Sequence, residues 1–119
     1  MKIKCIKTSV DNPNNGIING DMKEYLVIGT LFWVFGVRFF KSITYAYIFD
    51  GNHLFEVPIE LFEVVDSKVS SEWRIKIGDS GEVTLWPELF YENNFIENFA
   101  EREYKERELF KELRAEIER

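Results

Sequence analysis

Residues 50–62 read DGNHLFEVPIELF and residues 78–90 read GDSGEVTLWPELF, so one pattern occurs twice in the chain. Each copy opens with a glycine-containing turn, continues through an apolar stretch, and ends in a proline and the triplet Glu-Leu-Phe, which Ile59 separates in the first copy. Asp-Gly is a strong signal for a β-hairpin, and proline stops a strand because it has no N–H to donate to the ladder. The pattern therefore predicts two hairpins, each followed by a short apolar plug.

The stretches around these turns have the composition of strands. The hairpin arms are expected at residues 43–49 and 53–57, and at residues 73–77 and 83–86. Further strands are expected at 2–7, at 61–65 and within the apolar passage 23–41, where β-branched and aromatic side chains gather. About five to seven strands in a chain this short predict a small barrel or a strongly curled antiparallel sheet.

The passage 23–41 is the most apolar part of the chain. Its uninterrupted apolar part is shorter than the about 20 residues that a membrane-spanning helix needs, and its β-branched content favours one bent strand or a hairpin pair. Strand alternation places Trp33 and Phe35 on the same face. Because both faces are apolar, either both are covered or one meets a partner.

The periodicity changes after Pro87. Apolar residues then recur at helical spacing, and Asn94 followed by Glu97 is typical of a helix N-terminus. We therefore expect a C-terminal helix or a pair of helices. The predicted fold is mainly β, of the α+β class, with a single domain over residues 1–119 that divides into a β barrel (1–90) and a helical extension (91–119).

Composition places the chain among globular proteins and indicates a reducing environment. The chain has 119 residues, 45% of them apolar and 30% charged, with a formal net charge of −6. Residues 9–21 are rich in Asn, Asp, Gly and Pro and are expected to form a surface loop. The single Cys5 cannot form an internal disulfide, and no secretory leader is recognisable, so the cytoplasm is the expected location.

No set of residues predicts catalysis, a cofactor or a metal site. His53 is the only histidine and has no second His or Cys to complete a zinc site, so a surface histidine is expected. Cys5, in an apolar strand, is expected to be a small buried residue. Four carboxylates, Glu56, Glu60, Glu63 and Asp66, come close together in sequence. A solvated acidic rim is the favoured interpretation, and an enzyme acting through Glu56 and Asp66 remains an alternative.

The acidic balance argues against a broad nucleic-acid surface, because nucleic-acid binders neutralise phosphates with Lys and Arg. Aromatic side chains able to stack on bases are Trp33, Tyr45, Tyr47 and Trp73, and the candidate basic patch consists of Lys2, Lys4, Lys7, Arg38 and Lys41. The acidic groups would instead attract a basic partner.

Three stretches carry a resemblance to a known group. Residues 23–29 (KEYLVIG), 47–51 (YIFDG) and 58–66 (PIELFEVVD) resemble small bacterial proteins with an SH3-like barrel, and residues 71–73 and 82–87 continue the likeness over about two-thirds of the chain. This resemblance implies a small curled SH3-like barrel. Some proteins of this kind resemble immunity proteins, which bind and block a cognate toxin domain, and the resemblance implies no catalytic residue.

These observations lead to a first hypothesis and a rival. The first is a bacterial, cytoplasmic immunity-type protein that neutralises a basic toxin domain by occlusion. Its expected partner-binding residues are Trp33, Phe35, Glu56, Glu60 and Asp66. The rival is a small SH3-like module that binds peptide or nucleic acid without catalysis. No cofactor, metal ion or membrane enters either hypothesis, and the oligomeric state is left open.

Overall fold

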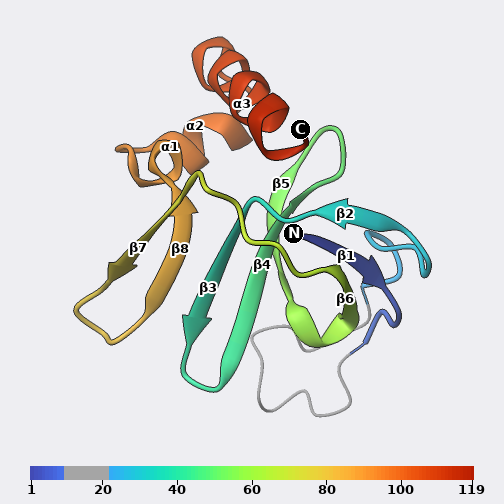
Figure 1. Cartoon of the computed structure of the whole chain (residues 1–119). Coiled ribbons are helices and arrows are strands. Elements are labelled where there is room, and N and C mark those ends of the chain that lie inside the picture. Colours follow the sequence, from blue (N-terminus) through green and yellow to red (C-terminus); the bar gives the residue numbers. More distant parts are fainter. Residues whose placement is uncertain (10–21) are drawn as a thin grey trace.

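The computed structural model describes residues 1–9 and 22–119, which form two antiparallel sheets and a set of C-terminal helices (Figure 1). The α+β class is thus confirmed. The loop expected at residues 9–21 lies outside the described residues except for Ser9. Among the described residues, no helix is long and apolar enough to cross a membrane.

Both predicted hairpins form. The first pairs β4 (Ile43–Phe49) with β5 (Leu54–Pro58), and the second pairs β7 (Trp73–Ile77) with β8 (Val83–Pro87). In the two turns, Gly51 and Gly81 have φ angles of +101° and +82°. Residues that carry a side chain rarely adopt a positive φ, so glycine allows the chain to reverse at these points.

Both prolines end a strand and lead into a helical turn. Pro58 precedes the 3-10 turn η2 (Ile59–Leu61), which runs directly into β6 (Phe62–Asp66), and Pro87 precedes α1 (Glu88–Tyr91). Leu61 and Phe90 are buried in these turns, which confirms the two apolar plugs. The copies then diverge, because the first turn continues as a strand and the second is followed by further helices.

The larger sheet has the strand order β5-β4-β3-β8-β7, in which β3 spans Gly36–Phe40. β3 pairs with β4 on one side and with β8 on the other. The two hairpins are therefore joined through β3. Among the described residues, β5 and β7 are the outer strands of this sheet (Figure 1).

The smaller sheet has the order β2-β1-β6, with β1 at Lys2–Cys5 and β2 at Leu31–Trp33. Its inner face packs on one face of the larger sheet. Ile3 and Cys5 alternate toward this interface, where they join Val37, Ala46, Ile48, Val57 and Leu61 in a single apolar core. Cys5 is fully buried, as expected, and burial raises the pKa of its thiol.

The helices cover one end of the opposite face of the larger sheet (Figure 1). α2 (Phe95–Ala100) and α3 (Tyr104–Ile117) follow α1. Alternate residues of β4 separate the two cores, because Ala46 and Ile48 face the smaller sheet while Tyr47 packs toward the helices. The core on the helical side is dominated by aromatic rings, those of Phe35, Tyr47, Phe90, Phe95, Phe99 and Phe110. Much of the aromatic content of the chain is therefore internal.

The helical region departs from expectation in two details. Helical structure begins at Glu88, before the expected boundary at residue 91, because α1 follows Pro87 directly. Asn94 is the N-cap residue of α2, but its φ of 62° is left-handed and its side chain makes no capping hydrogen bond. The sequence therefore predicted the start of α2 correctly, but the capping hydrogen bond expected from Asn94 is absent.

The described strands form two hydrogen-bonded sheets, and no ladder among them closes the two into one barrel. The passage 23–41 connects the two sheets, because the chain passes from one sheet to the other within it. The N–H of Val34 donates to the carbonyl of Met1 (3.0 Å), whereas the N–H of Phe35 donates to the carbonyl of Tyr47 (2.9 Å). The passage thus supplies β2 to one sheet and β3 to the other, and is neither a single bent strand nor a hairpin.

Candidate functional site

Two of the expected contact residues, Trp33 and Asp66, flank the same residue in the smaller sheet. Lys2 on β1 pairs with Trp33 on β2 and with Asp66 on β6. The ammonium of Lys2 lies 4.5 Å from the centroid of the Trp33 ring, within the range of a cation–π contact. The strand order therefore places an indole, an ammonium and a carboxylate in one row.

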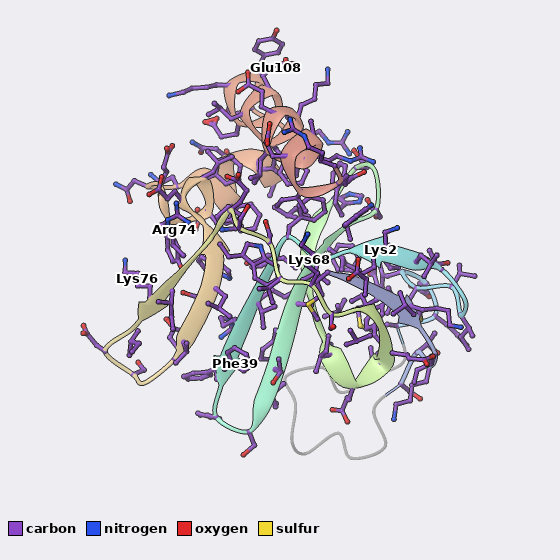
Figure 2. The ribbon with its side chains drawn as sticks, in the orientation of Figure 1. Lys2, Phe39, Lys68, Arg74, Lys76 and Glu108 are labelled. Atoms are coloured by element: carbon purple, nitrogen blue, oxygen red, sulfur yellow. The ribbon has the colours of Figure 1, made fainter. Side chains whose placement is uncertain are left out.

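Trp33 and Asp66 also line one cleft, which we call the Trp33 cleft. It has a volume of about 500 Å³ and is bounded by the end of β2, the segment between β6 and β7, and the last turn of α3. The segment between the strands contributes Lys68, labelled in Figure 2, together with Ser70 and Ser71. α3 contributes Glu116 and Ile117. Parts of the chain far apart in sequence therefore meet around a half-buried tryptophan.

The charges around the Trp33 cleft are mixed in sign. The carboxylate of Asp66 accepts a hydrogen bond from the backbone N–H of Lys68 (3.0 Å), and Arg119 donates to Glu116 (2.8 Å). An aromatic wall with a polar rim of both signs is typical of protein–protein contact surfaces, in which Trp is enriched at energetically dominant positions. It differs from the uniformly positive groove of single-strand nucleic-acid binders.

Phe35, also expected at the contact surface, is a core residue. Its side chain is 2% exposed and packs on Phe110, with the ring centroids 5.1 Å apart. Its carbonyl accepts a hydrogen bond from the indole N–H of Trp73 (3.1 Å). Phe35 is therefore too deeply buried to belong to a contact surface, although Trp33 packs against the same aromatic cluster from its partly exposed position.

Glu56 is bound within the larger sheet. It accepts two hydrogen bonds from Arg38, one from Nε to Oε2 (2.7 Å) and one from Nη2 to Oε1 (3.0 Å). The guanidinium also stacks on Tyr45, 4.5 Å from the ring centroid. The hydrogen bonds with Glu56 outweigh the opposing effect of burial and raise the pKa of Arg38. Glu56 therefore lies in a bidentate ion pair and is not part of the Trp33 cleft.

Glu60 lies apart from both groups. It is exposed on the turn η2, where it lines a shallow depression with Ser42, Ile43 and Thr44. Glu63, on β6, lies 4.0 Å from Lys4. The four carboxylates that are close in sequence are thus distributed among different environments. Within residues 1–9 and 22–119, no group of three or more His, Cys, Asp and Glu side chains is arranged to hold a metal ion.

The aromatic residues considered as a stacking platform do not share a surface. Tyr45, Tyr47 and Trp73 are buried, whereas Trp33 lines its cleft. Burial, followed by the nearby charge of Glu56, raises the pKa of Tyr47. Two cations of the candidate basic patch, Lys4 and Arg38, lie beside Glu63 and Glu56 respectively.

Sequence reasoning missed a contact between Asp50 and His53. The backbone N–H groups of Asn52 (2.8 Å) and His53 (2.6 Å) donate to Oδ1 of Asp50, and Nδ1 of His53 lies 3.3 Å from Oδ2. The signal was present in the sequence, because Asp at the start of a tight turn commonly accepts from the N–H two residues on. Asp50 and His53 also line a cleft of about 540 Å³ with Tyr25, whose side chain is exposed.

We expect Asp50→Ala to lower the free energy of unfolding by about 1–2 kcal/mol, because it leaves two turn N–H groups without their acceptor. Asp50→Asn keeps an acceptor oxygen and should cost less. Burial opposes ionisation of Asp50, but the N–H donors of His53 and Asn52 and the imidazole outweigh it and lower its pKa. The charge therefore stabilises the fold above the ordinary Asp pKa, and this contribution is lost as the pH falls through the lowered value.

Urea unfolding of the three proteins between about pH 3 and pH 7 measures both effects, since the pH window follows from the ordinary Asp pKa of about 3.9. The stability difference between the wild type and Asp50→Asn should shrink toward the acid end. Equal stabilities of the Ala and Asn variants at neutral pH would contradict the role of the turn hydrogen bonds.

Comparison with known proteins gives no relative: no family model, curated protein or solved structure matches this chain.

Proposed function

We propose that this protein is an immunity-type binding protein that neutralises a cognate toxin domain by occlusion, with the Trp33 cleft as its main contact surface. The observation that supports the proposal is the half-buried tryptophan in an open cleft with charges of both signs at its rim. A protein side chain inserted there would bury the indole and meet hydrogen-bonding groups on several sides.

The remaining support comes from charge and from the sequence likeness. The net charge of −6 favours rapid association with a basic toxin domain, since complementary charge mainly increases the association rate. Within this proposal, Trp33 supplies most of the binding energy, whereas Asp66 and the more distant Glu60 steer the encounter. The likeness to small bacterial SH3-like proteins, and the cytoplasmic setting that such a role requires, belong to the same proposal.

Co-expression tests the proposal. Products of the genes that neighbour this one are expressed in a sensitive cell with and without the protein, and growth is measured, followed by calorimetry on any pair that shows rescue. Wild-type protein should restore growth. Trp33→Ala should weaken binding by about thirtyfold, the effect of losing about 2 kcal/mol at a dominant contact.

Two further variants control for loss of folding. Ser71→Arg adds bulk at the exposed side of the Trp33 cleft without removing a core contact, and should also weaken binding. Tyr104→Ala removes another large aromatic side chain, 78% exposed, from outside the cleft and should bind as the wild type does. Failure of every neighbouring product to bind would refute the toxin proposal, and equal binding by all variants would refute the assignment of the cleft.

A further inference from the structure

β7 lies at the outside of the larger sheet, and most of it is exposed. In Figure 1 it is the strand farthest from β5, and among the described strands it pairs with β8 alone. Its first residue, Trp73, is buried, but Ile75 is 67% exposed and Ile77 is 70% exposed. Two large β-branched apolar side chains at an open sheet edge are unusual, because soluble proteins normally protect such edges.

The open edge presents backbone donors and acceptors. In an antiparallel ladder, N–H and C=O of alternate residues point toward the partner strand and away from it. The N–H of Gly78 donates to the carbonyl of Glu82 (2.9 Å), and the hydroxyl of Thr84 donates to the carbonyl of Lys76 (3.4 Å). The backbone N–H and C=O groups of the even-numbered residues of β7 therefore point toward β8. Those of Ile75 and Ile77 point away from it, toward the open edge.

One face of this edge is apolar across three strands. The register places Ile75 beside Leu85 and Ile77 beside Val83 on β8, and Val83 beside Phe39 on β3. Phe39, labelled in Figure 2, is 42% exposed. Farther along the same face, the smaller sheet covers the strands, so this apolar area is the part of the face that the smaller sheet leaves open.

The other face of β7 is basic. Arg74 and Lys76 alternate with the two isoleucines and project from the same strand (Figure 2). Arg74 lies 4.0 Å from Glu88, with both side chains exposed, and one of its guanidinium nitrogens also donates to the carbonyls of Ser71 and Trp73 (3.2 Å each). Lys76 lies 5.4 Å from the Tyr91 ring centroid. Such exposed contacts are weak and leave both cations available for a stronger partner.

Charge argues against a second copy of the chain at this edge. Symmetric antiparallel pairing of β7 centred on Ile75 sets Arg74 opposite Lys76 of the other copy, and pairing centred on Lys76 sets two lysines opposite one another. A register between these two pairs Ile75 with Lys76 of the other copy, and so places apolar and charged side chains on the same face of the joined sheet. Like charges in directly opposed positions destabilise a strand pair.

We propose that the β7 edge binds an extended segment of another protein as an added strand, in which apolar residues alternate with Asp or Glu. Its apolar side chains extend the Ile75–Ile77 face, and its carboxylates meet Arg74 and Lys76. Its backbone pairs with the outward N–H and C=O groups of the two isoleucines. The proposal concerns a surface separate from the Trp33 cleft and does not depend on the proposed toxin.

A terminally capped peptide of alternating valine and glutamate is the probe, and one of alternating valine and lysine is its control. Titration of the full chain, followed by backbone amide NMR, should shift the β7 signals and protect the amides of Ile75 and Ile77 from hydrogen exchange. The glutamate peptide should bind at least about tenfold more tightly than the lysine peptide, a difference of about 1.4 kcal/mol, and added salt should reduce the preference.

Charge reversal makes the test specific. The double variant Arg74→Glu with Lys76→Glu should reverse the preference to the lysine peptide, and this gain also shows that the variant folds. The single variant Lys76→Glu should reduce the preference. Lys105→Glu with Lys111→Glu makes the same change in net charge on α3, at exposed positions, and should leave the preference intact.

Three outcomes would overturn the proposal. Binding of neither peptide at millimolar concentration would show that the edge does not accept an added strand. Equal binding of the two peptides would remove the role of Arg74 and Lys76. Concentration-dependent dimerisation that protects the same two amides would assign the edge to a second copy of the chain.

Discussion

Replacing Phe110 with alanine should lower the free energy of unfolding by about 3–5 kcal/mol, the usual cost of removing a fully buried phenylalanine ring. Phe110 is 2% exposed. Its ring centroid lies 4.9 Å from those of both Phe49 on β4 and Phe99 on α2, and 5.1 Å from that of Phe35. One side chain of α3 therefore contacts both the larger sheet and the preceding helix.

The consequence should extend beyond a local cavity. A single domain of this size is stabilised by only about 5–15 kcal/mol, so this loss is a large fraction of the total. Because the remaining apolar residues of α3 are few, we expect α3 to separate from the sheet at lower denaturant concentration than the strands of the two hairpins. Urea unfolding monitored by far-ultraviolet circular dichroism and by tryptophan fluorescence measures the loss of unfolding free energy. It also shows whether α3 unfolds at a lower urea concentration than the strands.

Tyr104→Ala is the matched control, because it removes an aromatic ring from the same helix at an exposed position. It should change the free energy of unfolding by no more than about 0.5 kcal/mol. A cost below about 1 kcal/mol for Phe110→Ala would contradict the packing of α3 on the sheet, since a buried ring cannot be removed so cheaply.

Replacing Arg38 with leucine should destabilise the fold by about 2 kcal/mol, between the values for exposed and for buried ion pairs. The side chain of Arg38 is 17% exposed and that of Glu56 is 23% exposed. The variant leaves Glu56 largely out of water without its bidentate partner. Most of the expected cost is therefore the desolvation of an unpaired carboxylate.

Adding Glu56→Leu to Arg38→Leu tests this explanation. The second substitution removes the unpaired charge, so the double variant should regain at least half of the lost stability. The pair Lys4 and Glu63 is the control, because its side chains are 43% and 59% exposed and lie 4.0 Å apart. Its coupling should be below about 1 kcal/mol. If Glu56→Leu instead deepens the loss, the effect comes from the leucine at position 38 and not from the unpaired charge.

The sequence was most informative where local backbone chemistry decides the structure. Gly51 and Gly81 mark both hairpin turns, and Pro58 and Pro87 mark the ends of two strands, because each acts through its own backbone. The helical spacing of apolar residues after Pro87 likewise predicted C-terminal helices, of which α3 is one. These features need no information from distant parts of the chain.

The features that the sequence did not predict depend on which distant strands pair with one another. Nothing local in residues 31–40 shows that the chain changes sheets between Trp33 and Phe35, because both sides of that point have the composition of a strand. Trp33 and Asp66 meet around Lys2 because β1 lies between β2 and β6, an arrangement that only the fold specifies. For the same reason, the sequence predicted β7 as a strand but not its position at the edge.

The pairing of β3 with β8 has a kinetic consequence. The hairpins β4–β5 and β7–β8 join neighbouring residues, and such hairpins form on a timescale of microseconds. Val37 of β3 instead pairs with Leu85, with both the first hairpin and β6 between them in the chain. Ordering that long loop costs entropy before the new ladder offsets it. The slowest step in forming the larger sheet should therefore be the pairing of β8 with β3. This step joins two parts that have already formed, β3–β4–β5 and β7–β8.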